Sequence, residues 1–196
     1  MLNSTPLIYL AKIGLIDVIS KLRIESITSP SVKQEVIDRG LAMGAPEAEA
    51  LSKLLDEKVV KVVAPRNTSL FKSLLSIKGL STADAEILAL AKEHKGTAII
   101  DDKLARSVAK VYSISLGGTA HLLKLAIEEN IITKDRAKRS LDEMIAQGWR
   151  CGPEDYAKIL KQFDNVESPR SMFGSDKRLK RITKNEHQEF QRSHNI

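Results

Sequence analysis

The sequence predicts a three-layer α/β/α domain built around a small parallel sheet. Short apolar runs alternate with segments of helical hydrophobic spacing, and this alternation requires crossover connections between parallel strands. Hydrophobic residues make up 42% of the chain and aromatic residues only 4%, which is typical of an aliphatic interior. The single cysteine, Cys151, excludes a disulfide framework and a cysteine-based zinc cluster.

The first half of the chain is interpreted as three strands and the helices between them. The strands are expected at 1–3 (the last step of the first strand), 24–29 and 59–63. Helices are expected at 7–13, 15–22, 31–40, 46–58 and 67–78. Ser31 is expected to cap the third of these helices and Gly40 to end it, because glycine is common just after the last helical turn.

The stretch 79–119 is the part around which the rest is organised. Ser81 or Thr82 caps a helix whose apolar positions have helical spacing, and Gly96 ends that helix. An apolar run at 97–100 is typical of a strand buried on both faces. A helix then begins at 101–102, a strand follows at 112–115, and the glycine turn at 117–119 leads into a helix at 120–130. Two further helices are expected at 133–146 and 153–163.

Domain organisation follows from composition. Residues 1–165 are expected to form one domain, and residues 166–196 a basic flexible tail, because that segment is polar and rich in serine, arginine and lysine. The net charge of +6 is compatible with a nucleic-acid partner, although charge alone does not decide this. No early segment is long and apolar enough for a signal peptide or a membrane helix. A cytoplasmic protein without a membrane partner is therefore expected.

Several acids stand at positions where a solvated side chain is unexpected. Asp84 precedes Ile87 and Leu88 by three and four residues, so it lies on the apolar stripe of its helix. Glu35 follows Val32 by three residues and directly precedes Val36, so it too lies along an apolar stripe. A buried carboxylate needs a cation or several hydrogen-bond donors.

These acids are expected to meet at one edge of the sheet, where ligands bind beyond the carboxyl ends of the strands. Asn3 follows the first strand, Asp101 and Asp102 follow the strand at 97–100, and Glu35 and Asp84 lie on adjoining helices. Oxygen ligands without cysteine favour Mg²⁺ or Mn²⁺ over zinc. All five are candidate metal ligands, and Glu35, Asp84 and Asp102 are the candidate catalytic acids. Asp101 is alternatively a helix cap or an acid behind the ligands.

Each candidate also has a purely structural interpretation. Asp102 is a natural helix cap, and Asp84 gains from the dipole of its own helix. Glu35 can pair with Arg39 one turn later. Glu86, two residues after Asp84, is expected to point away into solvent.

The polar residues at helix starts are equally open to two interpretations. Asn3 is either a helix cap or a metal or phosphate contact. Ser4 and Thr119 can bind phosphate through backbone N–H groups, although capping alone explains them. Trp149 is expected to be a packing residue.

Four segments, taken in order, resemble the PIN-domain ribonucleases. They are NSTPLIYLAKIG at 3–14, VKQEVI at 32–37, ADAEILALA at 83–91 and IIDDKLAR at 99–106. The glycine turn and the helices after it are similar to the same family, so the resemblance covers about residues 1–165. It is strongest to the prokaryotic, in particular archaeal, branch of VapC-like toxins.

The resemblance implies a Mg²⁺- or Mn²⁺-dependent endoribonuclease (a hydrolase), the toxin of a toxin–antitoxin pair, that forms a homodimer and binds a small antitoxin protein. RNA is then the substrate. The residues placed to contact its phosphates are Ser4, Lys12, Lys33, Lys103, Arg106 and Thr119.

The chain departs from the family at Asn3, where PIN nucleases usually carry aspartate. An amide oxygen still binds a hard cation but brings no charge, so metal affinity should be lower. The alternative function is therefore a PIN-like module that binds RNA or protein with weak or no nuclease activity. A nucleotide-binding doubly wound domain is disfavoured, because no G-x-G-x-x-G motif follows the first strand.

Overall fold

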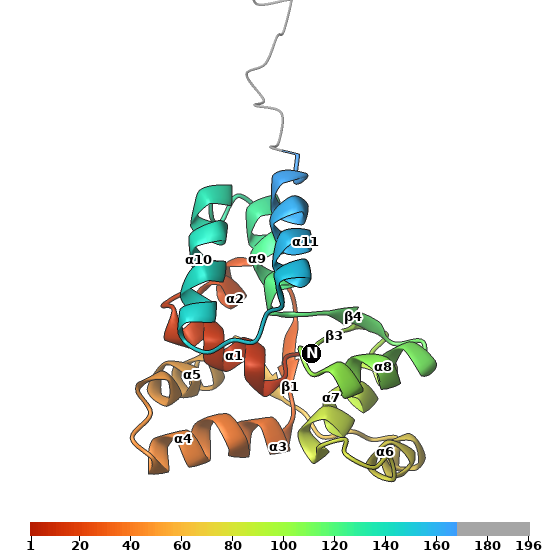
Figure 1. Ribbon diagram of the computed structural model, residues 1–196. Helices are drawn as coiled ribbons and strands as arrows, with labels where there is room; N and C mark the ends of the chain where they lie inside the picture. Colours follow the sequence, from red (N-terminus) through yellow and green to blue (C-terminus); the bar gives the residue numbers. More distant parts are fainter. Residues whose placement is uncertain (168–196) are drawn as a thin grey trace, which may run out of the picture. The chain divides into compact units, whose positions relative to one another are not determined.

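The sheet of the computed structural model, which describes residues 1–167, is small and parallel (Figure 1). Within this range its strands are β1 (Ser26–Thr28), β2 (Val60–Val62), β3 (Thr97–Ile99) and β4 (Ser115–Gly117). β1 pairs in parallel with β2, and β3 pairs in parallel with β4.

The first three residues join these two pairs of strands. The Leu2 N–H donates to the Ile27 carbonyl at 2.7 Å, and the Ile99 N–H donates to the Met1 carbonyl at 2.8 Å. The bridge between Leu2 and Ile99 is parallel. The order across the sheet is therefore β2, β1, residues 1–3, β3, β4. Residues 1–3 take the place expected for the first strand, but they form only an isolated bridge at Leu2.

Helices connect the strands and cover the sheet. They are α1 (Ser4–Lys12), α2 (Val18–Lys21), α3 (Pro30–Lys33), the π-helix η1 (Gln34–Asp38), α4 (Arg39–Ala42), α5 (Pro46–Asp56), α6 (Thr68–Leu75), α7 (Thr82–Glu93), α8 (Lys103–Val111), α9 (Thr119–Glu128), α10 (Lys134–Ala146) and α11 (Pro153–Asp164). The predicted caps Asn67, Ser81 and Thr133 all accept a backbone N–H at the start of their helices, so these helix starts are confirmed.

Helix α7 is the centre of the core. Every residue from Ala83 to Ala91 is buried, and the helix contacts β3, α3, α6 and α8. A second group of helices contains α1, which contacts α5, α9 and α10. In Figure 1, β3 and β4 run between α9 and α8. The architecture is thus the predicted three-layer α/β/α domain with a small parallel sheet.

The segment predicted as one helix at 31–40 differs from that prediction. It is capped by Ser29, whose Oγ accepts the Val32 N–H at 3.3 Å, and it passes from α3 through η1 into α4. Gly40 does not end it. A Cβ at Gly40 would lie 2.8 Å from the Ala48 Cβ, so glycine is needed there because α5 packs closely against α4.

Two further predictions were wrong in position. The strand expected at 112–115 begins only at Ser115, because α8 continues to Val111 and Ser113 has a positive φ of 51°. The helix expected at 15–22 is confined to α2, which has 4 residues.

The end of the domain lies at Val166, which is 6% exposed and packs in the core. Composition places Val166 in the tail, whereas the structure places it in the core; the predicted tail from residue 168 onward lies outside the described residues. Across residues 1–167 no helix has the length and apolar character needed to cross a membrane.

Candidate active site

Asn3 links the centre of the sheet to the start of α7. It occupies the N-cap position of α1, but its side chain makes no capping hydrogen bond. Instead its Nδ2 donates to Asp84 Oδ1 at 2.6 Å. This bond fixes the orientation of the amide and leaves Asn3 Oδ1 buried without a hydrogen-bond partner among residues 1–167.

Asp84 lies in the first turn of α7 and is 7% exposed. Its Oδ2 accepts from Ser81 Oγ at 2.6 Å, and its own N–H donates back to the same Oγ at 3.0 Å. Burial raises the pKa of Asp84 above its ordinary range, hydrogen bonds from Ser81 and Asn3 oppose that shift, and the charge of Asp102 adds to it. The prediction of a carboxylate on a buried helix face is confirmed.

Glu35 lies on η1 and is exposed, so the expectation of a place on a buried stripe was wrong. The π-helix shifts the register of the side chains, so spacing from Val32 and Val36 does not place Glu35 as in an α-helix. Its Oε2 accepts from Ser4 Oγ at 2.7 Å. Within the described residues no ion pair joins Glu35 to Arg39. Ser4 is buried, with 7% of its surface exposed. Its hydroxyl is therefore held in place, and the hydrogen bond that it donates orients Glu35.

Asp102 stands between β3 and α8 as the predicted helix cap. Its Oδ1 accepts the Ala105 N–H at 2.8 Å. The side chain is exposed, and its charge contributes to the raised pKa of Asp84. Asp102 therefore caps α8, and its charge acts on the Asp84 carboxylate.

Asp101 faces the other side of the same turn. Its carboxylate accepts the Thr119 N–H at 2.9 Å, the Thr119 hydroxyl, and Trp149 Nε1–H at 3.0 Å. These donors occupy Asp101, so the structure supports a structural role rather than metal binding. Thr119 is fully buried. Both its N–H and its hydroxyl donate to Asp101, so the predicted contact of Thr119 with a phosphate is not available. Gly118 is required here, because a Cβ would lie 2.6 Å from Asp101 Oδ1.

Asn3 and Asp84 together offer oxygen atoms of the kind that a hard divalent cation prefers. Across residues 1–167, no three or more His, Cys, Asp or Glu side chains lie together in a group that could hold a metal ion. Mg²⁺ does not need one, because it usually keeps several waters and binds one or two carboxylates. The unpartnered Asn3 Oδ1, next to Asp84, is an oxygen donor of the type that such an ion prefers.

The predicted phosphate-binding cations differ in their surroundings. Lys12 lies 3.9 Å from Glu47, and Arg106 Nη1 donates to the carbonyls of Ile100 and Gly117 at 2.9 and 3.1 Å. Arg106 thus holds together the ends of β3 and β4. Lys103, the first residue of α8, is exposed and has no ion-pair partner among residues 1–167.

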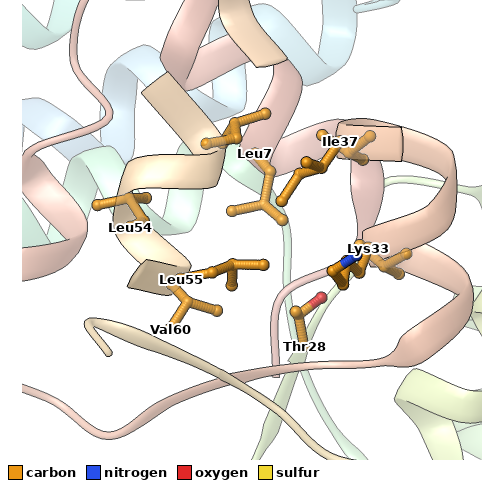
Figure 2. A pocket seen from close by; sticks show the side chains of 10 residues that line it. Leu7, Thr28, Lys33, Ile37, Leu54, Leu55 and Val60 are labelled. Atoms are coloured by element: carbon orange, nitrogen blue, oxygen red, sulfur yellow. The ribbon is translucent and has the colours of Figure 1, made fainter. Parts of the chain in front are cut away.

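Lys33 lies beside a small cavity rather than in an open cleft. Figure 2 shows its side chain together with Leu7, Ile37 and Val60 around this space. The cavity holds about 10 Å³, at the lower limit for a single water molecule. The ammonium group pairs with Asp38 at 2.7 Å. This apolar cavity is a packing defect of the core and no substrate site.

Sequence reasoning missed two contacts that support the site. Glu86 is 8% exposed rather than solvated, and its Oε2 accepts the Ser31 N–H at 2.9 Å. It therefore ties α7, which carries Asp84, to α3, which leads into Glu35. The bond from Ser81 to Asp84 was also missed. The spacing Ser81-x-x-Asp84 is that of a capping box, so this signal was present in the sequence.

The chain is similar to a known protein family along almost all of its described length. The model of a family described as a PIN domain matches residues 1–165, the range that contains every residue of the site. The comparison with curated proteins gives no match.

Proposed function

Because this chain belongs to the PIN-domain family, whose members are in general nucleases, we propose that it is an endoribonuclease that cleaves RNA phosphodiester bonds with Mg²⁺ or Mn²⁺. The residues that would hold the ion are Asn3, Glu35, Asp84 and Asp102. Asp101 is left out because three donors already occupy it.

The observation that carries the proposal is the buried, unpartnered Asn3 Oδ1 next to Asp84. A buried polar atom without a partner costs about 1–3 kcal/mol, so its persistence indicates a site built for something that binds there. A carboxylate with a raised pKa beside it agrees, because such shifts concentrate at functional sites.

The chain's own residues have separate tasks in this reaction. Ser81 and Asn3 orient the two oxygens of Asp84, and Ser4 orients Glu35. Asp102 is held by the first turn of α8. A divalent ion bound there would supply charge stabilisation for the phosphoryl oxygens and lower the pKa of an attacking water.

The direct test is incubation of a mixed RNA pool with the protein in EDTA, Mg²⁺ or Mn²⁺. We expect cleavage by the wild type only when the metal is present, and at least a hundredfold less by Asp84→Asn. Cleavage of equal rate by Asp84→Asn would indicate a contaminating nuclease or a different site.

A second candidate function is favoured by the bond between Asn3 and Asp84. This bond already occupies one oxygen of a metal ligand, which weakens the site for a cation. The protein would then be a PIN-like module that binds RNA or a protein without cutting it. RNA binding by the wild type in Mn²⁺ without any cleavage, at every metal concentration, would select this function.

The toxin role, the small antitoxin partner and the homodimer are proposed on the sequence resemblance alone. Light scattering tests the last of these, because the chain has a mass of 21.7 kDa and a dimer twice that mass. A monomer at micromolar concentration would contradict the homodimer.

A further inference from the structure

A groove of about 440 Å³ opens at the carboxyl end of β4. Its walls come from α8, from the turn between β4 and α9, and from α11 with the loop before it. Its size lies in the range of about 300–1,000 Å³ that is usual for ligand sites. The groove is therefore large enough to hold part of a substrate.

The side chains of the groove make it positive. Four of them are basic, namely Lys103, Arg106, Arg150 and Lys158, whereas Asp101 and Asp155 are acidic. Asp101 accepts hydrogen bonds from Thr119 and Trp149, but these neutral donors leave its charge in place. Asp155 lies 3.9 Å from Lys158, an exposed and weak pair. An excess of positive charge thus remains for an anionic ligand.

The groove continues the candidate active site along the same edge of the sheet. Asp101 and Asp102 are consecutive; Asp101 lines the groove, whereas the charge of Asp102 acts on Asp84. Lys103 follows at the start of α8 and also lines the groove. A phosphate chain that passed from Asp102 into the groove would cross the first turn of α8, where the helix dipole favours negative charge.

We propose that this groove holds the phosphodiester backbone of a single-stranded RNA on one side of the cleavage position. The proposal rests on the proposed nuclease function. Trp149 is 8% exposed and its N–H is bound by Asp101, so it offers no face on which a base could stack. Recognition is then by phosphate contacts in a positive groove, with little dependence on base sequence.

The chain carries its own probe for this groove. Cys151, the one cysteine in the sequence, lines it and is partly exposed. The rate at which iodoacetamide alkylates Cys151 in the full chain, followed by mass spectrometry in EDTA, reports whether the groove is covered. Burial and the charge of Asp155 raise the pKa of this thiol, so the measurement belongs at mildly alkaline pH.

Added single-stranded RNA should slow this alkylation several-fold, with a midpoint equal to the dissociation constant from fluorescence anisotropy. An unchanged rate at saturating RNA would overturn the proposal. Equal protection by a duplex of the same sequence would overturn its single-strand part. Protection by poly-glutamate but not by RNA would assign the groove to an acidic protein segment.

Charge variants give the second measurement. Arg150→Ala with Lys158→Ala should weaken RNA binding at least tenfold at low salt and reduce the salt slope by about 2. The matched control is Lys53→Ala with Lys72→Ala, which removes the same charge from α5 and α6 and should bind like the wild type. Equal losses in both pairs would show that net charge alone binds RNA.

The groove and the nuclease function can fail separately. Protection of Cys151 without cleavage in Mg²⁺ or Mn²⁺ would keep the groove and reject the nuclease. Cleavage without protection of Cys151 would keep the nuclease and reject the groove.

Discussion

Asn3 is the residue on which the chemistry of the site depends. Its Nδ2 donates to Asp84 while its Oδ1 lies buried and unpartnered. The amide thus stabilises the Asp84 carboxylate without adding charge. An aspartate at the same position would be nearly isosteric, but it would repel Asp84 instead of donating to it.

Asn3→Asp should therefore lower the stability of the metal-free protein and raise its affinity for metal. The metal-free variant should lose about 1–3 kcal/mol of unfolding free energy, because a buried charge-assisted bond becomes a like-charge contact. Mn²⁺ should bind about tenfold more tightly, and RNA cleavage at limiting metal should rise. Calorimetric titration with Mn²⁺ and denaturant unfolding check both, and weaker binding by the variant would contradict the assignment of Asn3 to the metal site.

Asp84→Asn should remove the response of the fold to metal. A ligand at one hundred times its dissociation constant stabilises the folded state by about 2.7 kcal/mol, so millimolar Mn²⁺ should raise the Tm of the wild type. It should leave the Tm of Asp84→Asn unchanged. An equal rise in both proteins would place the binding of Mn²⁺ elsewhere.

The same substitution has a pH signature in the metal-free protein. Burial raises the pKa of Asp84 in the folded state, so the folded protein binds this proton more tightly than the unfolded chain. Its ionisation therefore costs stability as the pH rises through and above the ordinary aspartate pKa of about 3.9. The Tm of Asp84→Asn minus that of the wild type should grow with pH across this window and then level off. A difference that shrinks as the pH rises would contradict the assigned direction.

At the scale of elements, η1 carries Glu35 and α7 carries Asp84. The buried carboxylate of Glu86 connects α7 to α3, the helix before η1. Glu86 on α7 accepts the N–H of Ser31 on α3, and α3 leads directly into the π-helix that carries Glu35. π-Helices are rare and often occur at functional sites. The position of Glu35 relative to Asp84 therefore depends on the contact of Glu86 with α3.

Glu86→Ala should loosen this contact. We expect a loss of about 1.5–3 kcal/mol, the usual value of a hydrogen bond to a charged group, together with weaker Mn²⁺ binding through a displaced Glu35. Glu86→Gln keeps an acceptor of the same shape and is the matched control. Thermal melts and Mn²⁺ titration check both effects; if Glu86→Ala keeps the metal affinity of the wild type, Glu35 is not positioned through α3.

Sequence signals predicted the elements whose causes are local. The caps Asn67, Ser81 and Thr133 satisfy nearby backbone N–H groups. The burial of Asp84 was predicted from the apolar stripe of its own helix, whereas the same reasoning failed for Glu35, which is exposed. Features that depend on distant contacts were missed. Gly40 looks like a residue that ends a helix, but the need for glycine there comes from close packing against Ala48 on another helix. Similarly, the burial of Glu86 follows from Ser31, which is 55 residues away in the chain.

At the scale of the whole molecule, positive charge is unevenly placed. Part of the formal excess of +6 lies in the groove beside β4, and part lies in the segment after residue 167. By sequence, residues 168–196 contain seven Lys or Arg and three Asp or Glu residues. Both regions should attract RNA, and the groove includes Asp101, the neighbour of Asp102.

Removal of residues 168–196 should weaken RNA binding at low salt, because the chain loses positive charge that releases counterions. The Tm should change little, since Val166, the last core residue, is retained. Anisotropy at several salt concentrations and thermal melts check this. A large fall in Tm would show that the removed segment packs on the domain.

The place of residues 1–3 in the sheet also governs the order in which the protein can assemble. Their partner Ile27 is a near neighbour in the chain, but the ammonium group of Met1 bonds to the Thr97 carbonyl across a separation of 96 residues. Closing so long a loop is entropically costly and slows folding. During synthesis residues 1–3 are made before β3 and must wait for it before the two halves of the sheet can join. Asn3 then reaches Asp84 in that same step, so the site is completed together with the sheet.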